Sequence, residues 1–215
     1  TLPTEMCHSA VGEDGLHEEI QRGMTAGLKH IETVLGRKFG APQNTLLLSV
    51  RSGAPVSMPG MMDTILNLGL NDEVAKGLAN ETGNARFVYD AYRRLLQMFG
   101  DVVLGVGPEH VLAEDPFEAL LEKKKDAFDV VEDIDLPAEA LKELVEEFKS
   151  TIEQRGKTFP QDPQEQLRLA VQSVFASWNT ERALAYRRIN QIPAHWGTAC
   201  NVQAMVFGNL GTDCG

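Results

Sequence analysis

The 215-residue sequence predicts an α+β fold in which helices make up most of the chain. Residues 72–190 show helical periodicity almost throughout, with apolar side chains recurring every three or four positions. Two strand-like segments flank this region: the apolar run 46–50 and the alternating segment 198–207, which residues 208–209 turn. Because two strands do not complete a sheet, we expect further strands outside this sequence.

The composition is that of an ordinary globular protein, with 43% hydrophobic and 24% charged residues. No apolar run approaches the roughly 20 residues that cross a bilayer, and no secretory leader opens the sequence, so we expect no membrane partner. Cys7, Cys200 and Cys214 are scattered without metal-ligand spacing, which is typical of a reducing compartment. We therefore expect a cytoplasmic location, with an organelle as the alternative.

The net charge of −11 argues against non-specific binding of nucleic acid. This charge is concentrated, since the segment from Glu109 to Glu165 carries 17 acidic and 7 basic residues. The acidic segment is also helical in pattern, which predicts a solvated helical insertion. The near-neutral remainder is the better place for an anionic ligand.

The first predicted helix is amphipathic and ends at Gly40. Its apolar stripe comprises Leu16, Ile20, Met24, Leu28, Ile31, Leu35 and Phe39. His17 and His30 lie off this stripe, so we expect both at the surface. The strand 46–50 follows.

Capping residues predict where the later helices begin. Asn71 or Asp72 opens a helix over 73–80 that Gly83 ends, and a second helix covers 86–99. Four further starts are Asp115-Pro116, Leu136-Pro137, Asp162-Pro163 and Thr180, the last opening a helix to Asn190. Arg93 and Arg94 are expected on a solvated face, with contact to a ligand or a partner domain as the less favoured alternative.

The segment 49–64 joins the first strand to the helical region and is rich in Gly, Pro and Ser. Such a loop can turn backbone N–H groups toward an anion, with the guanidinium of Arg51 at its mouth. The structural alternative is a strand end with an exposed arginine and a tight turn. Asp63 could assist a Mg²⁺-nucleotide or, equally well, cap a helical turn starting at Thr64.

Several catalytic motifs are missing from the sequence. It contains no Walker A loop, no G-x-G-x-x-G, no H-E-x-x-H and no C-x-x-C. The five histidines lack the spacing of a metal site, so we predict no metal-ligating residues in this chain.

The loop segment carries a long motif: Ser49-Val-Arg-Ser-Gly-Ala is followed by Ser57-Met-Pro-Gly-Met-Met-Asp-Thr-Ile-Leu-Asn-Leu-Gly-Leu-Asn-Asp72. This motif resembles the signature of the pyruvate, phosphate dikinase family. Supporting matches lie at residues 87–94, Trp178 and residues 197–209, so the resemblance covers essentially the whole chain. Phosphoenolpyruvate synthases and rifampin phosphotransferases differ, because they follow Val-Arg-Ser with a second Ser and an acidic segment.

The resemblance implies part of an ATP-grasp domain with a large, mainly helical insertion. Residues 1–71 would be the first part of a subdomain with the phosphate loop, 72–190 the insertion, and 191–215 the return with an adenine-hinge strand. The family's full enzyme is a phosphotransferase that uses Mg²⁺ and converts ATP, phosphate and pyruvate to AMP, diphosphate and phosphoenolpyruvate. A phosphohistidine on another domain carries the phosphoryl group, and relatives are commonly homodimers.

By motif match, Arg51 would bind the ATP phosphates and stabilise charge during transfer, a role that suits a guanidinium. The loop covering the phosphates would be Gly60, Met61, Met62 and Asp63. The hinge strand would contribute Gln203, Met205 and Val206, with Met205 as an apolar wall for the adenine ring.

Some parts of the family's site are not in this sequence. The ATP-site lysine would precede Thr1, the acidic Mg²⁺ ligands would follow Gly215, and the phosphocarrier histidine motif is absent. Asp213 and Cys214 also depart from the family's Ser before a Gly-Thr-Gly turn. We therefore expect a fragment that is inactive alone.

Two alternatives stay open. One is the kinase domain of a phosphoenolpyruvate synthase-like enzyme, which uses water in place of phosphate. The other is a non-catalytic interaction module, in which the acidic helices bind a partner.

Overall fold

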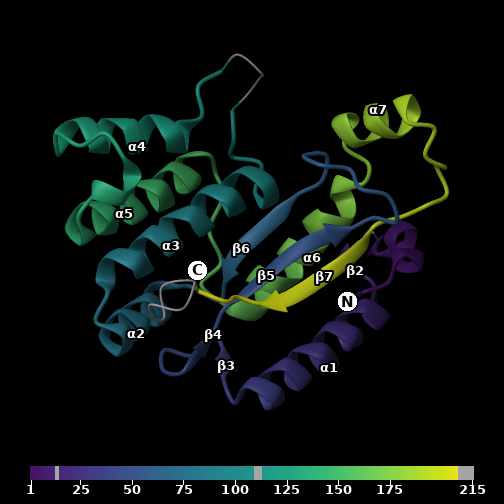
Figure 1. The fold of residues 1–215 in the computed structure, drawn as a ribbon, viewed down its shortest axis with the longest axis horizontal. Coiled ribbons are helices and arrows are strands. Elements are labelled where there is room, and N and C mark those ends of the chain that lie inside the picture. Colours follow the sequence, from purple (N-terminus) through teal and green to yellow (C-terminus); the bar gives the residue numbers. More distant parts are fainter. Residues whose placement is uncertain (13–14, 109–112, 208–215) are drawn as a thin grey trace.

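The protein folds around a small central sheet with helices beside and behind it (Figure 1). The structure is a computed structural model that describes residues 1–12, 15–108 and 113–207. Helices and short sheets together make the fold α+β, as the sequence predicts. The predicted turn at 208–209 and the departures at Asp213 and Cys214 lie outside the described residues.

The central sheet has the strand order β6-β5-β7. Strand β5 (Leu48–Gly53) lies in the middle and pairs antiparallel with β6 (Thr64–Leu68) and with β7 (Ala199–Ala204). The two predicted strands are therefore confirmed, although the first begins two residues later than predicted, at Leu48, and extends three residues beyond its predicted end. Thr198 fixes this end, because its hydroxyl oxygen accepts a hydrogen bond of 3.1 Å from the backbone N–H of Gly53.

Strand β6 was not predicted from the sequence. The interpretation of Asp63 as the cap of a helical turn from Thr64 is wrong, because Thr64 begins this strand. Two local features interrupt the alternation that marks a strand: Asn67 has a φ of 61°, and the pairing register shifts between Leu48 and Val50.

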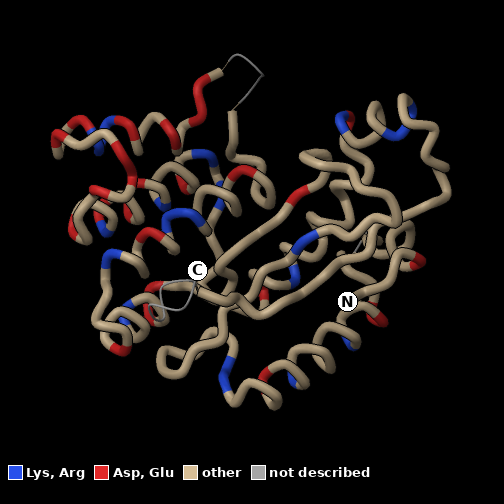
Figure 2. Tube along the Cα trace, viewed as in Figure 1, with Lys and Arg blue, Asp and Glu red and all other residues tan. Residues whose placement is uncertain are grey.

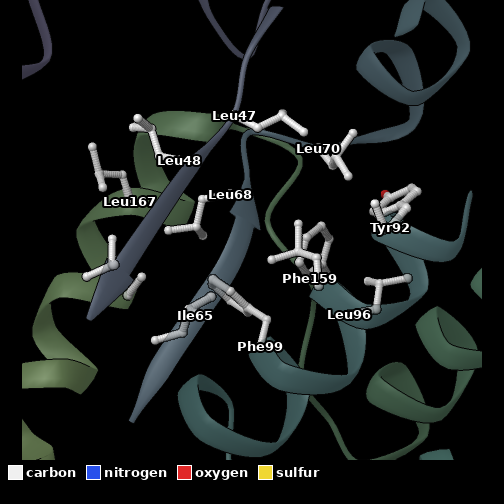
Figure 3. Close-up of a cluster of buried hydrophobic side chains, with 14 of the residues drawn as sticks. Leu47, Leu48, Ile65, Leu68, Leu70, Tyr92, Leu96, Phe99, Phe159 and Leu167 are labelled. Atoms are coloured by element: carbon white, nitrogen blue, oxygen red, sulfur yellow. The ribbon is translucent and has the colours of Figure 1, made fainter. Parts of the chain in front are cut away.

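One face of the sheet is apolar and covered by helix α6 (Pro163–Ser177). Leu48, Val50 and Ile65 are fully buried, and Figure 3 shows Leu48 beside Leu167 of α6. Since alternate residues of a strand point to opposite faces, Ser49, Arg51 and Gly53 lie on the other face. The sheet thus separates an apolar side from a polar one.

Four helices, α2 to α5, form a layer at the β6 edge of the sheet (Figure 1). Helix α3 (Ala85–Met98) packs on β6, α2 (Asp72–Thr82) and α5 (Ala138–Gln154) pack on α3, and α4 (Pro116–Ala127) packs on α5. A π-helical turn (Phe99–Val103) follows α3, and a 3₁₀ turn (Asp133–Asp135) precedes α5. No helix of the described ranges is long and apolar enough to cross a bilayer.

The predicted helix starts are confirmed by their capping geometry. Side chains cap α2, α4, α6 and helix α7 (Glu181–Ile189) through hydrogen bonds to backbone N–H groups within the first turn. The capping residues are Asn71, Asp115, Asp162 and Thr180. The start of α5 differs slightly, since Pro137 itself occupies the cap position and makes no side-chain bond.

The N-terminal part begins with a 3₁₀ turn (Thr4–Ser9) and a hairpin of β1 (Val11–Gly12) and β2 (Gly15–Leu16). Helix α1 (Glu18–Leu35) then ends earlier than predicted, because Gly36 rather than Gly40 takes the left-handed cap with a φ of 62°. The last apolar residue of the predicted stripe instead lies in β3 (Lys38–Phe39), which pairs with β4 (Thr45–Leu46). His17 and His30 are exposed, as predicted.

The prediction of a solvated face is wrong for Arg93 and right for Arg94. The Arg93 side chain is 3% exposed and pairs with Asp90 at 2.8 Å and with Asp133 at 2.7 Å. Arg94 lies at the surface and contacts Asp90 at 3.0 Å. Arg93 therefore joins α3 to the turn before α5 and is part of the packing of the helical layer.

Candidate functional site

Arg51 stands on the polar face of the central strand, and no residue of the described ranges forms an ion pair with it. It lies opposite Thr64 of β6 and Asn201 of β7, and it is exposed. Among the residues that the structure describes, no side chain or backbone group bonds its guanidinium. An arginine carries five N–H donors, so this one is available to an external anion.

The neighbours of Arg51 on this face are polar and small. Strand register places Gln203 opposite Ser49, two positions along β7 from Asn201, and Gln203 is exposed. A Cβ atom added at Gly53 would lie 2.5 Å from the side-chain nitrogen of Asn201, so only glycine fits there without moving that amide. The described part of the sheet therefore offers a face with a free cation, Arg51, and an exposed amide, Gln203.

The glycine-rich loop forms a tight turn next to this face. The backbone N–H of Met61 donates to the Met58 carbonyl oxygen at 3.1 Å, and Gly60 between them has a φ of 71°. Proline at the second position and a positive-φ glycine at the third are the pattern of a type II turn. Met58 is buried and Met62 packs partly on the core, so methionine side chains anchor the loop while Gly60 is exposed.

Asp63 ends the loop and pairs with Arg182 of α7. The Arg182 guanidinium also donates from Nε to the Met61 carbonyl oxygen at 3.3 Å. Burial raises the pKa of the Asp63 carboxyl, and the charge of Arg182 partly opposes that rise. The local sequence gave no indication of Arg182, because it follows Asp63 by 119 residues and only the fold brings them together.

The charge of Arg182 also acts on a second carboxylate, that of Asp101. Burial raises the pKa of Asp101, the charges of Asp115 and Asp63 raise it further, and Arg182 lowers it. Arg182 therefore partly offsets the negative charge of two carboxylates, Asp63 and Asp101. Within the described ranges, no group of three His, Cys, Asp or Glu residues is arranged to hold a metal ion.

The predicted hinge residues lie at the other end of β5. The backbone N–H of Met205 donates to the Leu47 carbonyl oxygen at 2.9 Å, and Met205 packs partly on the core. Val206 is 88% exposed, and Phe207 meets Phe87 edge to face at 5.1 Å. Strands rise about 3.3 Å per residue, so this end lies roughly 20 Å from the Gly53 end.

The structure thus brings some predicted site residues together and separates others. Arg51 and Gln203 share one face, and Asp63 directly precedes Thr64, the strand partner of Arg51. Met205 and Val206 mark the opposite end of the same strand pair. The fold and this face define an α+β domain with a long polar surface that presents an unpaired cation.

Comparison with known proteins assigns this domain to a family. Residues 6–213 match the family described as pyruvate phosphate dikinase, AMP/ATP-binding domain. The chain belongs to this family, as the resemblance in its sequence predicts.

Curated relatives match the whole chain or nearly all of it. Pyruvate, phosphate dikinase of Clostridium symbiosum is 48% identical over 218 residues, covering 100% of this chain and 24% of that protein. The Giardia intestinalis protein of the same name is 54% identical over 202 residues, covering 94% and 22%. A relative named pyruvate, phosphate dikinase, chloroplastic, from Mesembryanthemum crystallinum is 51% identical over 221 residues, covering 100% and 22%. The chain spans about a quarter or less of the length of these relatives.

Proposed function

We propose that this chain forms one wall of an ATP site in a dikinase. The observation that carries the proposal is the unpaired Arg51 guanidinium on the polar face of the sheet, beside the glycine-rich loop. Membership of a family described as AMP/ATP-binding supports it. Arg51 would bind the phosphates and offset the negative charge that develops as the phosphoryl group leaves.

The rest of the nucleotide would follow the polar face from one end to the other. Gly60, Met61, Met62 and Asp63 would cover the phosphates, with the exposed Gly60 able to approach them closely. Gln203, Met205 and Val206 would lie along the adenine, and Val206 has the exposure that such a contact needs. The backbone N–H of Met205 already bonds Leu47, so its contribution would be its side chain or its carbonyl oxygen.

Mg²⁺ would accompany ATP into the site and offset phosphate charge. Asp63 is the carboxylate of the loop, but Arg182 engages it. We therefore assign no metal ligand in this chain, and we propose that carboxylates outside it hold the ion.

For the full-length protein we propose the dikinase reaction, with a phosphohistidine on another domain as the carrier and a homodimer as the assembly. An ATP-grasp fold would place a second lobe over the open polar face. Within it, residues 1–71 and 191–215 would build the subdomain and residues 72–190 the helical insertion. Helix α6 would join that insertion to the subdomain, since it packs on the sheet.

The buried free thiols of Cys7 and Cys200 suit a reducing compartment, either cytoplasm or an organelle.

The experiment that tests the function is Arg51→Ala in the full-length protein. Formation of AMP and diphosphate should fall by about 10³-fold, since removing one charge-stabilising group costs that much in comparable sites. Pyruvate binding should be unchanged, and Arg22→Ala, which removes an exposed guanidinium from α1, is the matched control. Undiminished AMP formation in Arg51→Ala would overturn the assignment.

The two alternatives give different results in the same assays. A synthase-like enzyme would complete its reaction without added phosphate, whereas a dikinase requires it. An interaction module would release no heat on titration with ATP and Mg²⁺. Both measurements use the wild-type protein and need no variant.

A further inference from the structure

The start of α7 places Arg182 next to the glycine-rich loop. The Thr180 hydroxyl oxygen accepts from the backbone N–H of Ala183 at 3.4 Å, and Ala183 is completely buried. Arg182 lies between these two fixed residues, and its guanidinium reaches the Met61 carbonyl oxygen and the Asp63 carboxylate. One side chain therefore contacts the loop both at its turn and at its end.

The loop has few other polar ties to the rest of the molecule. Among the described residues, segment 54–63 makes one further hydrogen bond, which lies inside its own turn between Met61 and Met58. Buried or half-buried methionines give apolar contact but no fixed direction, because methionine is flexible. The hydrogen bonds from Arg182 are thus the directional contacts that join this segment to another element.

The charge of Arg182 matters for an anionic ligand as well. Asp63 lies next to Thr64, the strand partner of Arg51, and Asp101 is near enough for the charge of Arg182 to oppose the rise that burial causes in its pKa. Without Arg182, unpaired carboxylates would border the phosphate site and repel ATP. Arg182 therefore combines two effects, since it fixes the loop and offsets its negative charge.

We propose that Arg182 is a positioning residue that holds loop 58–63 in the geometry that covers the β- and γ-phosphates of ATP. It acts through the Met61 carbonyl and the Asp63 carboxylate and does not itself touch the nucleotide. This inference rests on the proposed function, because it assumes that the loop covers phosphates.

The test compares Arg182→Ala, Arg182→Lys and Arg188→Ala in the full-length protein. Arg188 is an exposed arginine on the same helix, and it makes no hydrogen bond or ion pair with the loop among the described residues, so it is the matched control. Affinities for ATP and for AMP are measured by calorimetry, and hydrogen–deuterium exchange is followed in peptides covering residues 54–66. AMP lacks the two phosphates that the loop would cover.

Arg182→Ala should weaken ATP binding about tenfold, as expected for the loss of a charge-assisted contact, and leave AMP affinity within twofold. Peptides from the loop should exchange faster, while those from α6 should not change. Arg182→Lys should recover ATP affinity to within about threefold, since an ammonium can still pair with Asp63. Arg188→Ala should behave as wild type in every measurement.

Three results would overturn the inference. In the first, Arg182→Ala and Arg188→Ala bind ATP equally well. In the second, Arg182→Ala loses ATP and AMP affinity to the same extent and α6 exchanges faster. In the third, Arg182→Lys recovers no ATP affinity. Each leaves the proposed function standing, provided that the wild type binds ATP and Arg51→Ala impairs AMP formation. A wild-type protein that does not bind ATP would instead overturn the proposed function.

Discussion

At the scale of one residue, Asp133 in the turn before α5 pairs with the buried Arg93 of α3, and replacing Asp133 tests what this ion pair contributes to stability. Asp133→Asn removes the negative partner that lies 2.7 Å from the Arg93 guanidinium and leaves Asp90 to offset this buried charge. We expect a loss of about 1–2 kcal/mol, the usual effect of weakening a hydrogen bond to a charged group. Amide hydrogen exchange of α3 and α5 in the full-length protein measures this free energy.

The pH dependence of the same contact has a definite sign. Burial alone would raise the pKa of Asp133, but the contacts with Arg93 and Lys125 outweigh it and lower the pKa below its ordinary value. The unfolded carboxyl titrates near its ordinary value, so the ion pair stabilises the fold above about pH 4. Its contribution is lost as the pH falls through the lower, folded pKa. The difference between wild type and Asp133→Asn should be constant from pH 5 to 7 and shrink below pH 4; a difference that grows in acid would contradict this assignment.

Single residues of the candidate site were predictable to different degrees. Arg51 and the loop residue Gly60 could be predicted as site residues because the end of a strand and a segment rich in glycine and proline lie next to each other in the sequence. The partner of Asp63 could not, because Arg182 is near it only after the chain has folded. Adjacent arginines 93 and 94 look alike in sequence, yet the acidic partners of Arg93 come partly from a turn 40 residues away.

At the scale of elements, replacing glycine by alanine should have opposite effects on the stability of two helices. A Cβ atom at Gly77 in α2 would collide with the backbone carbonyl of Pro42, whereas one at Gly27 in α1 would meet nothing within 4 Å. Gly77→Ala should therefore destabilise α2 by roughly 1–3 kcal/mol, because backbone cannot move aside cheaply. Gly27→Ala should stabilise α1 by about 0.5–1 kcal/mol through higher helix propensity.

Hydrogen exchange of the α1 and α2 peptides in the full-length protein measures the change in stability of each helix. The two variants serve as controls for each other, since the added methyl group is identical. Stabilisation of α2 by Gly77→Ala would show that the Pro42 segment shifts readily and that the packing here is loose.

Elements were predictable where one residue type fixes their limits. Cap residues such as Asn71 and Asp162 bond the first turn of the helix that follows them, so the helix starts are local properties. Strand β6 was missed because its identity depends on pairing with β5, and the positive φ of Asn67 disrupts its alternation. The end of α1 was misplaced because two glycines, Gly36 and Gly40, both have positive φ and either suits a helix cap.

At the scale of the whole molecule, most of the negative charge lies away from the candidate site, where Arg182 partly offsets the charges of Asp63 and Asp101. Figure 2 shows acidic residues gathered on α4 and α5, whereas β7 carries none. Packing runs from β6 through α3 to α5 and then α4, so α3 and α5 lie between the acidic helix α4 and the sheet. Charges separated by more than a Debye length, about 8 Å at physiological salt, are largely screened. The acidic helices should therefore have little influence on an anion bound at Arg51.

Neutralising three exposed acidic residues of this layer tests the separation of charge from function. The variant combines Asp126→Asn, Glu132→Gln and Glu139→Gln, which are all at the surface. ATP affinity of the full-length protein, measured by calorimetry at physiological salt, should change by less than twofold, because screening and the intervening helices remove the long-range effect. At low salt the variant should bind ATP slightly more tightly, since less negative charge repels it. A tenfold change at physiological salt would mean that these helices take part in the site, and the layer would then have to close over the nucleotide during binding.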